Sequence, residues 1–149
     1  MYQKILVPLD GSELAECVLP HVKAIARACG VGEVVLLEVV EPPPTWAAEG
    51  VDLYALQSAD VKAAKEYLSK KQSQLSSEGF NVSSELSVGR AAEVITEFAK
   101  QNAIDFIAIA THGRSGISRW VLGSVADKVL RSSNVPMLVI KPAGCESDA

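Results

Sequence analysis

Residues 109–125 have the sequence IATHGRSGISRWVLGSV, in which two glycine turns, at Gly113 and at Gly123-Ser124, enclose two arginines. Glycine lets a backbone approach a ligand closely, and the N–H groups at the start of a helix favour an anion. The Ser124 hydroxyl can donate a further hydrogen bond, and arginine suits bidentate contact with phosphate. The stretch has no Gly-Lys-[Ser/Thr] triplet, so it lacks the lysine of a P-loop. It therefore predicts phosphate binding without the charge that P-loop enzymes direct at the β- and γ-phosphates.

A second polar group follows the first apolar run, where the sequence is Pro8-Leu9-Asp10-Gly11-Ser12. Asp10 can contact a ribose or a metal-bridged phosphate, or it can serve only as the turn residue before Gly11. His112 is a candidate general base, although a lone histidine at the end of a strand is more often structural. No base–nucleophile pair is evident, so no catalytic residue is assigned.

Hydrophobic periodicity and turn signals predict the elements that position these residues. Continuous apolar runs indicate strands covered on both faces, and the partial alternation of the third run favours a sheet edge. The helical period places Cys29, Leu56 and Leu130 among the inward-facing residues. The predicted strands are 4–10, 33–41, 81–88, 105–111 and 135–141, and the predicted helices are 12–29, 52–77, 91–102 and 124–132.

Strands that alternate with helices predict an α/β fold with a single, doubly wound parallel sheet of five strands. In such sheets a ligand binds beyond the carboxyl ends of the strands, where the strand order reverses. If the first and fourth strands are neighbours, the segments after Leu9 and after Ala110 share one crevice.

The chain resembles a universal stress protein over nearly its whole length, through KILVPLDGSE, EVVLLEVVE and VPMLVIKP. The most specific match is the nucleotide-binding pattern Gly-x2-Gly-x9-Gly-[Ser/Thr] of that family. Here Gly113 is followed by nine residues and then by Gly123-Ser124, whereas Ala110 stands at the first glycine position and adds a methyl group. The resemblance implies a Rossmann-like sheet of the adenine nucleotide alpha hydrolase type, with strand order 3-2-1-4-5. The domain is expected over residues 1–142, with a disordered tail at 143–149.

The resemblance also implies a ligand, ATP or the related AMP or ADP, and a set of residues around it. The first and second strand ends would flank the base and ribose, and the glycine turns would meet the phosphates through backbone N–H groups. Mg²⁺ held by Asp10 together with the nucleotide is a further expectation, and Arg114 is left open between phosphate and dimer surface. The implied binding residues are Pro8, Leu9, Asp10, Val39, Ile109, Ala110, Gly113, Arg114, Gly123, Ser124 and Val125. The implied assembly is a homodimer that pairs the last strand, Val135 to Lys141, across a two-fold axis.

Composition limits the partners and the compartment. The net charge is 14 − 18 = −4, which argues against nonspecific nucleic-acid binding. The N-terminus does not have the pattern of a signal peptide, and no apolar run approaches the ~20 residues of a membrane span. The three cysteines form no CxxC or metal-binding spacing, which favours a reducing compartment. We therefore expect a cytoplasmic protein that binds neither membrane nor nucleic acid.

Three functions remain open on the sequence. The first is a regulatory or stress-response module that binds ATP or a related adenine nucleotide. The second is a slow ATPase or nucleotide hydrolase, with at most weak turnover, and the third is a dimeric adaptor that binds no nucleotide. A flavodoxin-like electron carrier shares the predicted topology, but the chain has no distinct flavin loop and only 5% aromatic residues.

Overall fold

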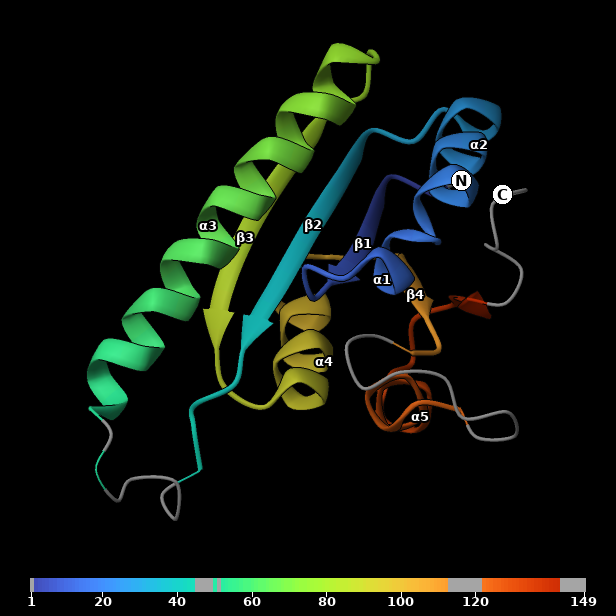
Figure 1. Cartoon of the computed structure of the whole chain (residues 1–149). Coiled ribbons are helices and arrows are strands. Elements are labelled where there is room, and N and C mark those ends of the chain that lie inside the picture. Colours follow the sequence, from blue (N-terminus) through green and yellow to red (C-terminus); the bar gives the residue numbers. More distant parts are fainter. Residues whose placement is uncertain (1, 45–49, 51, 113–121, 143–149) are drawn as a thin grey trace.

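The computed structural model describes residues 2–44, 50, 52–112 and 122–142, which form five strands and five helices (Figure 1). Gly113, Arg114 and the tail at 143–149 lie outside the described residues. The elements in chain order are β1 (Lys4–Leu9), α1 (Glu13–Glu16), α2 (Leu19–Cys29), β2 (Glu33–Val40), α3 (Leu53–Ser77), β3 (Val82–Val88), α4 (Ala91–Gln101), β4 (Phe106–Ala110), α5 (Ser124–Ser132) and β5 (Met137–Ile140).

The five strands form one parallel sheet in the order β3-β2-β1-β4-β5, which confirms the predicted fold class and strand order. The apolar runs in β1, β2 and β4 are almost fully buried, as expected for strands covered on both faces. β3, in which only Val82 is buried, lies at an edge of the sheet as predicted.

Two hydrophobic cores lie on opposite faces of the sheet. One core joins α1, α2 and α3 to the sheet through residues such as Val18, Val22 and Leu68. The other joins α4 and α5 to it through residues such as Ile95 and Val129. Figure 1 shows α3 lying along β3 and β2. Across the described ranges, no helix combines the length and hydrophobicity that a membrane crossing requires.

The prediction of one helix over 12–29 is wrong, because the chain forms two helices there. α1 ends at Glu16, and α2 begins at Leu19 with a proline in its first turn. Pro20 has no N–H to donate, and in a continuous helix its ring would collide with the carbonyl of Glu16. The predicted ends of the segment are correct: Ser12 caps α1 by accepting from the N–H of Ala15, and Gly30 ends α2 with φ +62°.

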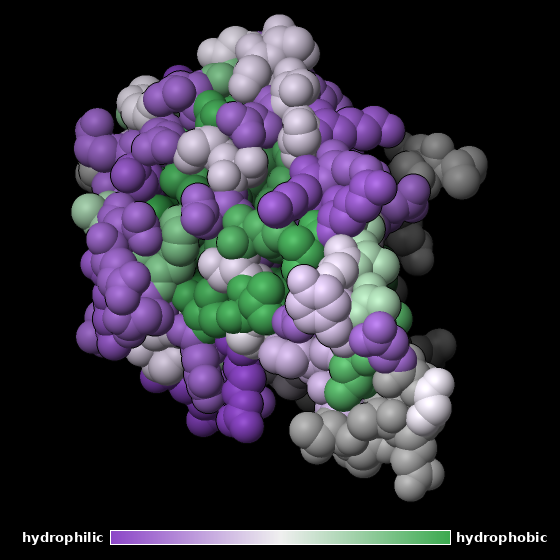
Figure 2. All heavy atoms as spheres, turned by 90° about the vertical axis from the view of Figure 1, so that its left-hand side faces the viewer, coloured by the Kyte–Doolittle hydropathy of each residue, from purple (hydrophilic) through white to green (hydrophobic). Residues whose placement is uncertain are grey.

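Three residues predicted to face inward are instead exposed: Cys29, Leu56 and Leu130. Cys29 is the last residue of α2. Leu56 is exposed because α3 is longer than β3, the strand beside it. A helix of 25 residues is about 37 Å long, whereas β3 with 7 residues spans about 23 Å. The first turns of α3 therefore project past the sheet (Figure 1). Figure 2 views the molecule from this side and shows a hydrophobic area framed by hydrophilic residues.

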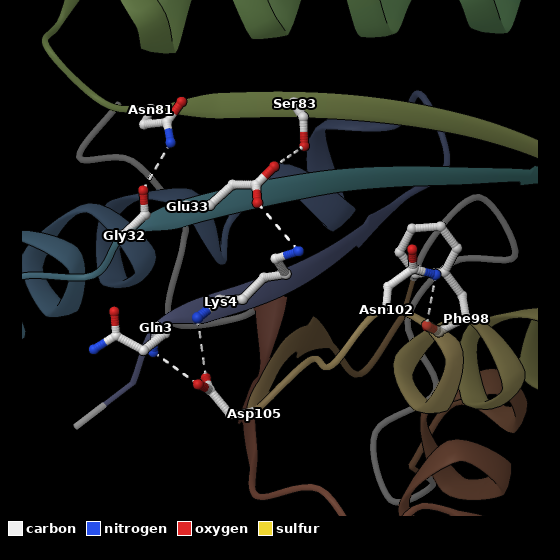
Figure 3. A network of polar contacts seen from close by, with 9 residues as sticks. All are labelled: Gln3, Lys4, Gly32, Glu33, Asn81, Ser83, Phe98, Asn102 and Asp105. Carbon is white, nitrogen blue, oxygen red and sulfur yellow. Dashed lines mark hydrogen bonds and ion pairs between the residues drawn. The ribbon is translucent and has the colours of Figure 1, made fainter.

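Polar contacts join four strands at the end of the sheet where the strands begin (Figure 3). The Asp105 carboxylate, just before β4, accepts from the N–H groups of Gln3 (2.7 Å) and Lys4 (3.2 Å). The ammonium of Lys4 lies 3.3 Å from Glu33 Oε2 on β2, and the hydroxyl of Ser83 on β3 donates to Glu33 Oε1 at 2.6 Å. These contacts favour one register across β4, β1, β2 and β3.

The same contacts lower the pKa of Glu33 below its ordinary value. The hydrogen bond from Ser83 is the largest cause, and Lys4 acts in the same direction, whereas burial opposes both. The ionised carboxylate is therefore the form that the fold prefers. Its contribution to stability is present above the ordinary pKa of about 4.3 and is lost as the pH falls through the lowered value.

We predict that Asp105→Ala lowers the free energy of unfolding by about 1–2 kcal/mol, because two main-chain N–H groups lose a charged acceptor. Urea denaturation at pH 7 measures the change. Glu97→Ala is the matched control, since Glu97 is an exposed carboxylate bonded only within α4 to Gln101 among the contacts described, and it should change stability by less than about 0.5 kcal/mol. Equal effects of the two substitutions would contradict a register role for Asp105.

Candidate functional site

The strand order reverses between β1 and β4, which are adjacent at the middle of the sheet. The chain leaves β1 toward α1 and α2 on one face, and it leaves β4 toward α5 on the other. A cavity of about 630 Å³ lies at the carboxyl ends of β1, β2 and β4. The ends of the first and fourth strands thus share one crevice, as expected from the sequence.

Seven of the eleven predicted binding residues line this cavity. They come from four elements and their ends, and they are Pro8, Leu9, Asp10, Val39, Ile109, Ala110 and Val125. Gly123 and Ser124 lie directly before Val125 at the start of α5. Gly113 and Arg114 fall outside the described residues, so the structure neither adds them to the site nor removes them from it.

The backbone of Gly123 lies against the end of β4. A Cβ atom at Gly123 would come to 1.7 Å from the main-chain oxygen of Thr111 and to 3.6 Å from the Cα of His112. The backbone angles of Gly123, φ −54° and ψ 145°, are open to any residue. Space, rather than conformation, therefore requires glycine at this position.

Gly123, the N-cap residue of α5, has no side chain with which to cap the helix. Within the part of the chain that the structure describes, no side chain makes a capping hydrogen bond there. Ser124 is the first residue of the helix, and its side chain is exposed. The first N–H groups of a helix have no acceptor within the helix itself, and they carry its positive partial charge. An acceptor placed beside Val125 would meet these groups.

Asp10 belongs both to a turn and to the cavity wall. Its Oδ1 accepts from the N–H of Ser12 at 2.9 Å and from the hydroxyl of the same residue. Gly11, with φ +83°, provides the left-handed conformation that the turn needs. The two interpretations of Asp10 given by the sequence are therefore compatible, because the turn presents the carboxylate at the cavity.

The wall also has an acidic part that was not predicted from the sequence, formed by Glu38 and Glu41 with Asp60 of α3. Glu38 is only 5% exposed, and a charged residue inside the apolar run EVVLLEVVE was a signal that could have identified it. No lysine or arginine occurs among the described lining residues. This wall offers hydrogen-bond acceptors, and it disfavours a phosphate next to it.

Tyr67 is a further missed residue, because helical periodicity alone does not show which face of α3 meets the cavity. Its hydroxyl donates to Glu16 Oε2 at 3.0 Å, and Lys71 forms an ion pair with the other oxygen of that carboxylate. Burial raises the pKa of Tyr67 far above its ordinary value, and the carboxylates of Glu16, Glu38 and Asp10 raise it further. Tyr67 therefore stays protonated and keeps its proton directed at Glu16.

His112, which the sequence treated as structural, also lines the cavity. Its Nδ1 lies 2.8 Å from the hydroxyl of Thr111, a residue that is 5% exposed. Its Nε2 is buried and has no hydrogen-bond partner in the described part of the chain. The N–H of Thr111 donates to the carbonyl of Ile140 at 2.8 Å, which ties this corner to β5.

The described residues contain no group of three or more His, Cys, Asp or Glu side chains arranged to hold a metal ion. A divalent ion at Asp10 would therefore depend on oxygens that the ligand brings.

Comparison with known proteins gives a family match over residues 1–141, to the model described as Universal stress protein family. Universal stress protein MJ0577 of Methanocaldococcus jannaschii is 31% identical over 156 residues, covering 95% of this chain and 96% of that protein. A solved structure of MJ0577 superposes with a TM-score of 0.84 at 33% identity, covering 100% of this chain and 99% of the other.

Two more distant structures contain adenine nucleotides. A universal stress protein in complex with cAMP has a TM-score of 0.61 at 22% identity, covering 95% of this chain and 98% of the other. A universal stress protein family protein of Arabidopsis thaliana with AMP bound has a TM-score of 0.68 at 17% identity, with coverages of 93% and 91%. At these identities the likeness concerns the fold.

We predict that Gly123→Ala displaces the start of α5 and lowers the free energy of unfolding by about 1–3 kcal/mol, the cost of overpacking. Urea denaturation gives the loss, and the backbone amide resonances of Thr111 and His112 should shift. Gly79→Ala is the control, because Gly79 has φ +95° but open space around a Cβ, so it should cost only about 1–2 kcal/mol of backbone strain. Unchanged Thr111 and His112 resonances in Gly123→Ala would show that the contact is unimportant.

Proposed function

The chain belongs to the universal stress protein family, and we propose that it binds an adenine nucleotide in the cavity at the carboxyl ends of β1, β2 and β4. The protein would act as a regulatory or stress-response module rather than as an efficient enzyme. We propose the cytoplasm as its location, on the cysteine pattern and composition of the sequence.

The observation that carries this proposal is the contact of Gly123 with Thr111. It brings the start of α5, which no side chain of the described residues caps, to the edge of a crevice where the strand order reverses. Backbone N–H groups at such a start bind phosphate without needing a lysine. The cavity volume also falls within the roughly 300–1,000 Å³ typical of small-molecule sites.

The chemistry of the wall favours one orientation of the nucleotide. Apolar side chains such as Leu9, Val39 and Ile109 suit the base, and the carboxylate of Asp10 can accept from ribose hydroxyls. The phosphates would lie toward Gly123 and Val125, away from the acidic residues of β2 and α3. The adenine base is proposed because two proteins of this fold were solved with cAMP and with AMP.

Mg²⁺ would enter this site with the nucleotide. Asp10 is the candidate protein ligand, and the remaining ligands would be phosphate oxygens and water. A divalent ion would offset the repulsion between a di- or triphosphate and the carboxylates of the wall.

Two alternatives follow from other observations. Asp10 and His112 both line the cavity, which is what a slow nucleotide hydrolase would need. Ala110, 7% exposed in the wall, adds a methyl group at the first motif position, which suits an adaptor that binds no nucleotide. If the wild-type protein releases phosphate from ATP and Asp10→Ala abolishes this release, the hydrolase is favoured.

We predict that AMP, ADP or ATP with Mg²⁺ raises the melting temperature by several degrees, because a ligand that binds only the native state stabilises it. A hundredfold excess over Kd corresponds to about 2.7 kcal/mol. Gly123→Ala should lose the shift, whereas Lys128→Ala, an exposed change on the same helix, should keep it. Two negative results together would contradict nucleotide binding and favour the adaptor. They are no shift in melting temperature with any of the three nucleotides, and no nucleotide released when the purified protein is denatured.

We also propose that the chain forms a homodimer through residues 135–141. The N–H groups of Ile107 and Thr111 donate to the carbonyls of Pro136 and Ile140, so alternation turns the main-chain groups of Met137 and Val139 outward. β5 is an apolar edge strand whose four residues are all partly exposed. Such an edge invites pairing with a second strand.

We predict that Val139→Pro converts a dimer into a monomer, because proline removes an outward N–H group while the bonds from β4 to Pro136 and Ile140 remain. Sedimentation velocity measures the change in mass. Val88→Pro is the matched control, since it places the same substitution on the opposite edge strand, and it should leave the mass unchanged. A wild-type protein that sediments as a monomer at micromolar concentration would refute this assembly.

A further inference from the structure

We propose that His112 is the side chain that distinguishes a nucleotide from a nucleoside, with its Nε2–H donating to a phosphoryl oxygen of the ligand. The inference rests on the proposed nucleotide site, because it concerns the same cavity. It assigns a binding role to a residue outside the set that the sequence pattern implied.

The first step is an inventory of the donors in the wall. Among the described lining side chains, only those of Tyr67 and His112 carry a hydrogen-bond donor at neutral pH, since the others are apolar or are carboxylates. The hydroxyl of Tyr67 already donates to Glu16 at 3.0 Å. His112 is therefore the candidate donor to an anion among the described side chains of the wall.

The second step concerns the tautomer of the imidazole. The 2.8 Å contact between Nδ1 and the Thr111 hydroxyl fits either direction of donation. When the hydroxyl donates, Nδ1 is the acceptor and the proton resides on Nε2. Nε2 is buried without a partner in the described part of the chain, and such a group costs free energy until it is paired. An anionic ligand would select the tautomer with the proton on Nε2 and would pair it.

The third step is position. His112 follows β4, and its Cα is close to the point where a Gly123 side chain would begin. Val125, in the first turn of α5, lines the same cavity. The imidazole therefore lies at the phosphate end of the proposed site. A phosphate there could be held by helix N–H groups and by His112 together.

Long-range ¹H–¹⁵N correlation of the imidazole nitrogens tests the tautomer directly in the wild-type protein. The chain has two histidines, so exposed His21 on α2 is an internal control. AMP and inorganic phosphate should shift the Nε2 signal of His112 to the protonated, pyrrole-like position, whereas adenosine should not. A response to adenosine equal to that for AMP, or no response to AMP at saturation, overturns the inference.

Calorimetric affinities give the second measurement. His112→Ala should weaken AMP roughly tenfold or more, the effect of losing a hydrogen bond to a charged group, and should leave adenosine within about twofold. His112→Gln, which retains an N–H donor, should recover most of the loss, and His21→Ala should change neither affinity. An equal loss of affinity for AMP and adenosine, or no loss for AMP, refutes the role of His112 but leaves the proposed function unaffected. A wild-type protein that binds no adenine nucleotide refutes the proposed function as well.

Discussion

The close approach of Gly123 to the main-chain oxygen of Thr111 is the constraint on which the site depends. It joins the start of α5 to the end of β4 at a distance that no side chain permits. The helix consequently begins at the crevice without a capping side chain among the described residues, and His112 lies close to its start. The anion site that we propose would thus be made mainly by backbone. A chain can therefore dispense with a P-loop lysine when packing, instead of charge, positions the donors.

The strands were predictable because burial on two faces leaves an unmistakable apolar run, as in residues 33–41. The alternation with helices and the handedness of crossovers predicted a doubly wound sheet, and the resemblance to a known family implied the strand order. The errors arose where local and tertiary effects compete. Pro20 divides one periodic segment into two helices. Leu56 fits the apolar period of α3 but extends beyond the strand that would have covered it. Periodicity fixes the face of a helix, whereas only the lengths of its neighbours decide how much of that face is buried.

The candidate site likewise contains residues that the sequence could predict and residues that it could not. Residues at strand ends, such as Asp10 and Ala110, were predictable because topology brings carboxyl ends together. Tyr67 was not predictable, since its place in the wall depends on how α3 crosses the sheet, and no spacing in the sequence encodes that crossing. Glu38 left a visible signal, a carboxylate in an apolar strand, but its significance appears only when the cavity is seen beside it. The binding roles of all these residues remain predictions, and Gly113 and Arg114 also lie outside the described residues.

Thr111 contacts three different parts of the structure. Its carbonyl meets Gly123, its hydroxyl meets His112, and its N–H is bonded to Ile140 at the end of β5. One buried residue therefore contacts both His112, which lines the cavity, and the outer strand proposed for dimerisation. If occupancy of the cavity strengthens pairing along β5 through this residue, pairing must raise the affinity of the cavity by the same factor. The concentration of the protein itself would then set how much nucleotide it holds.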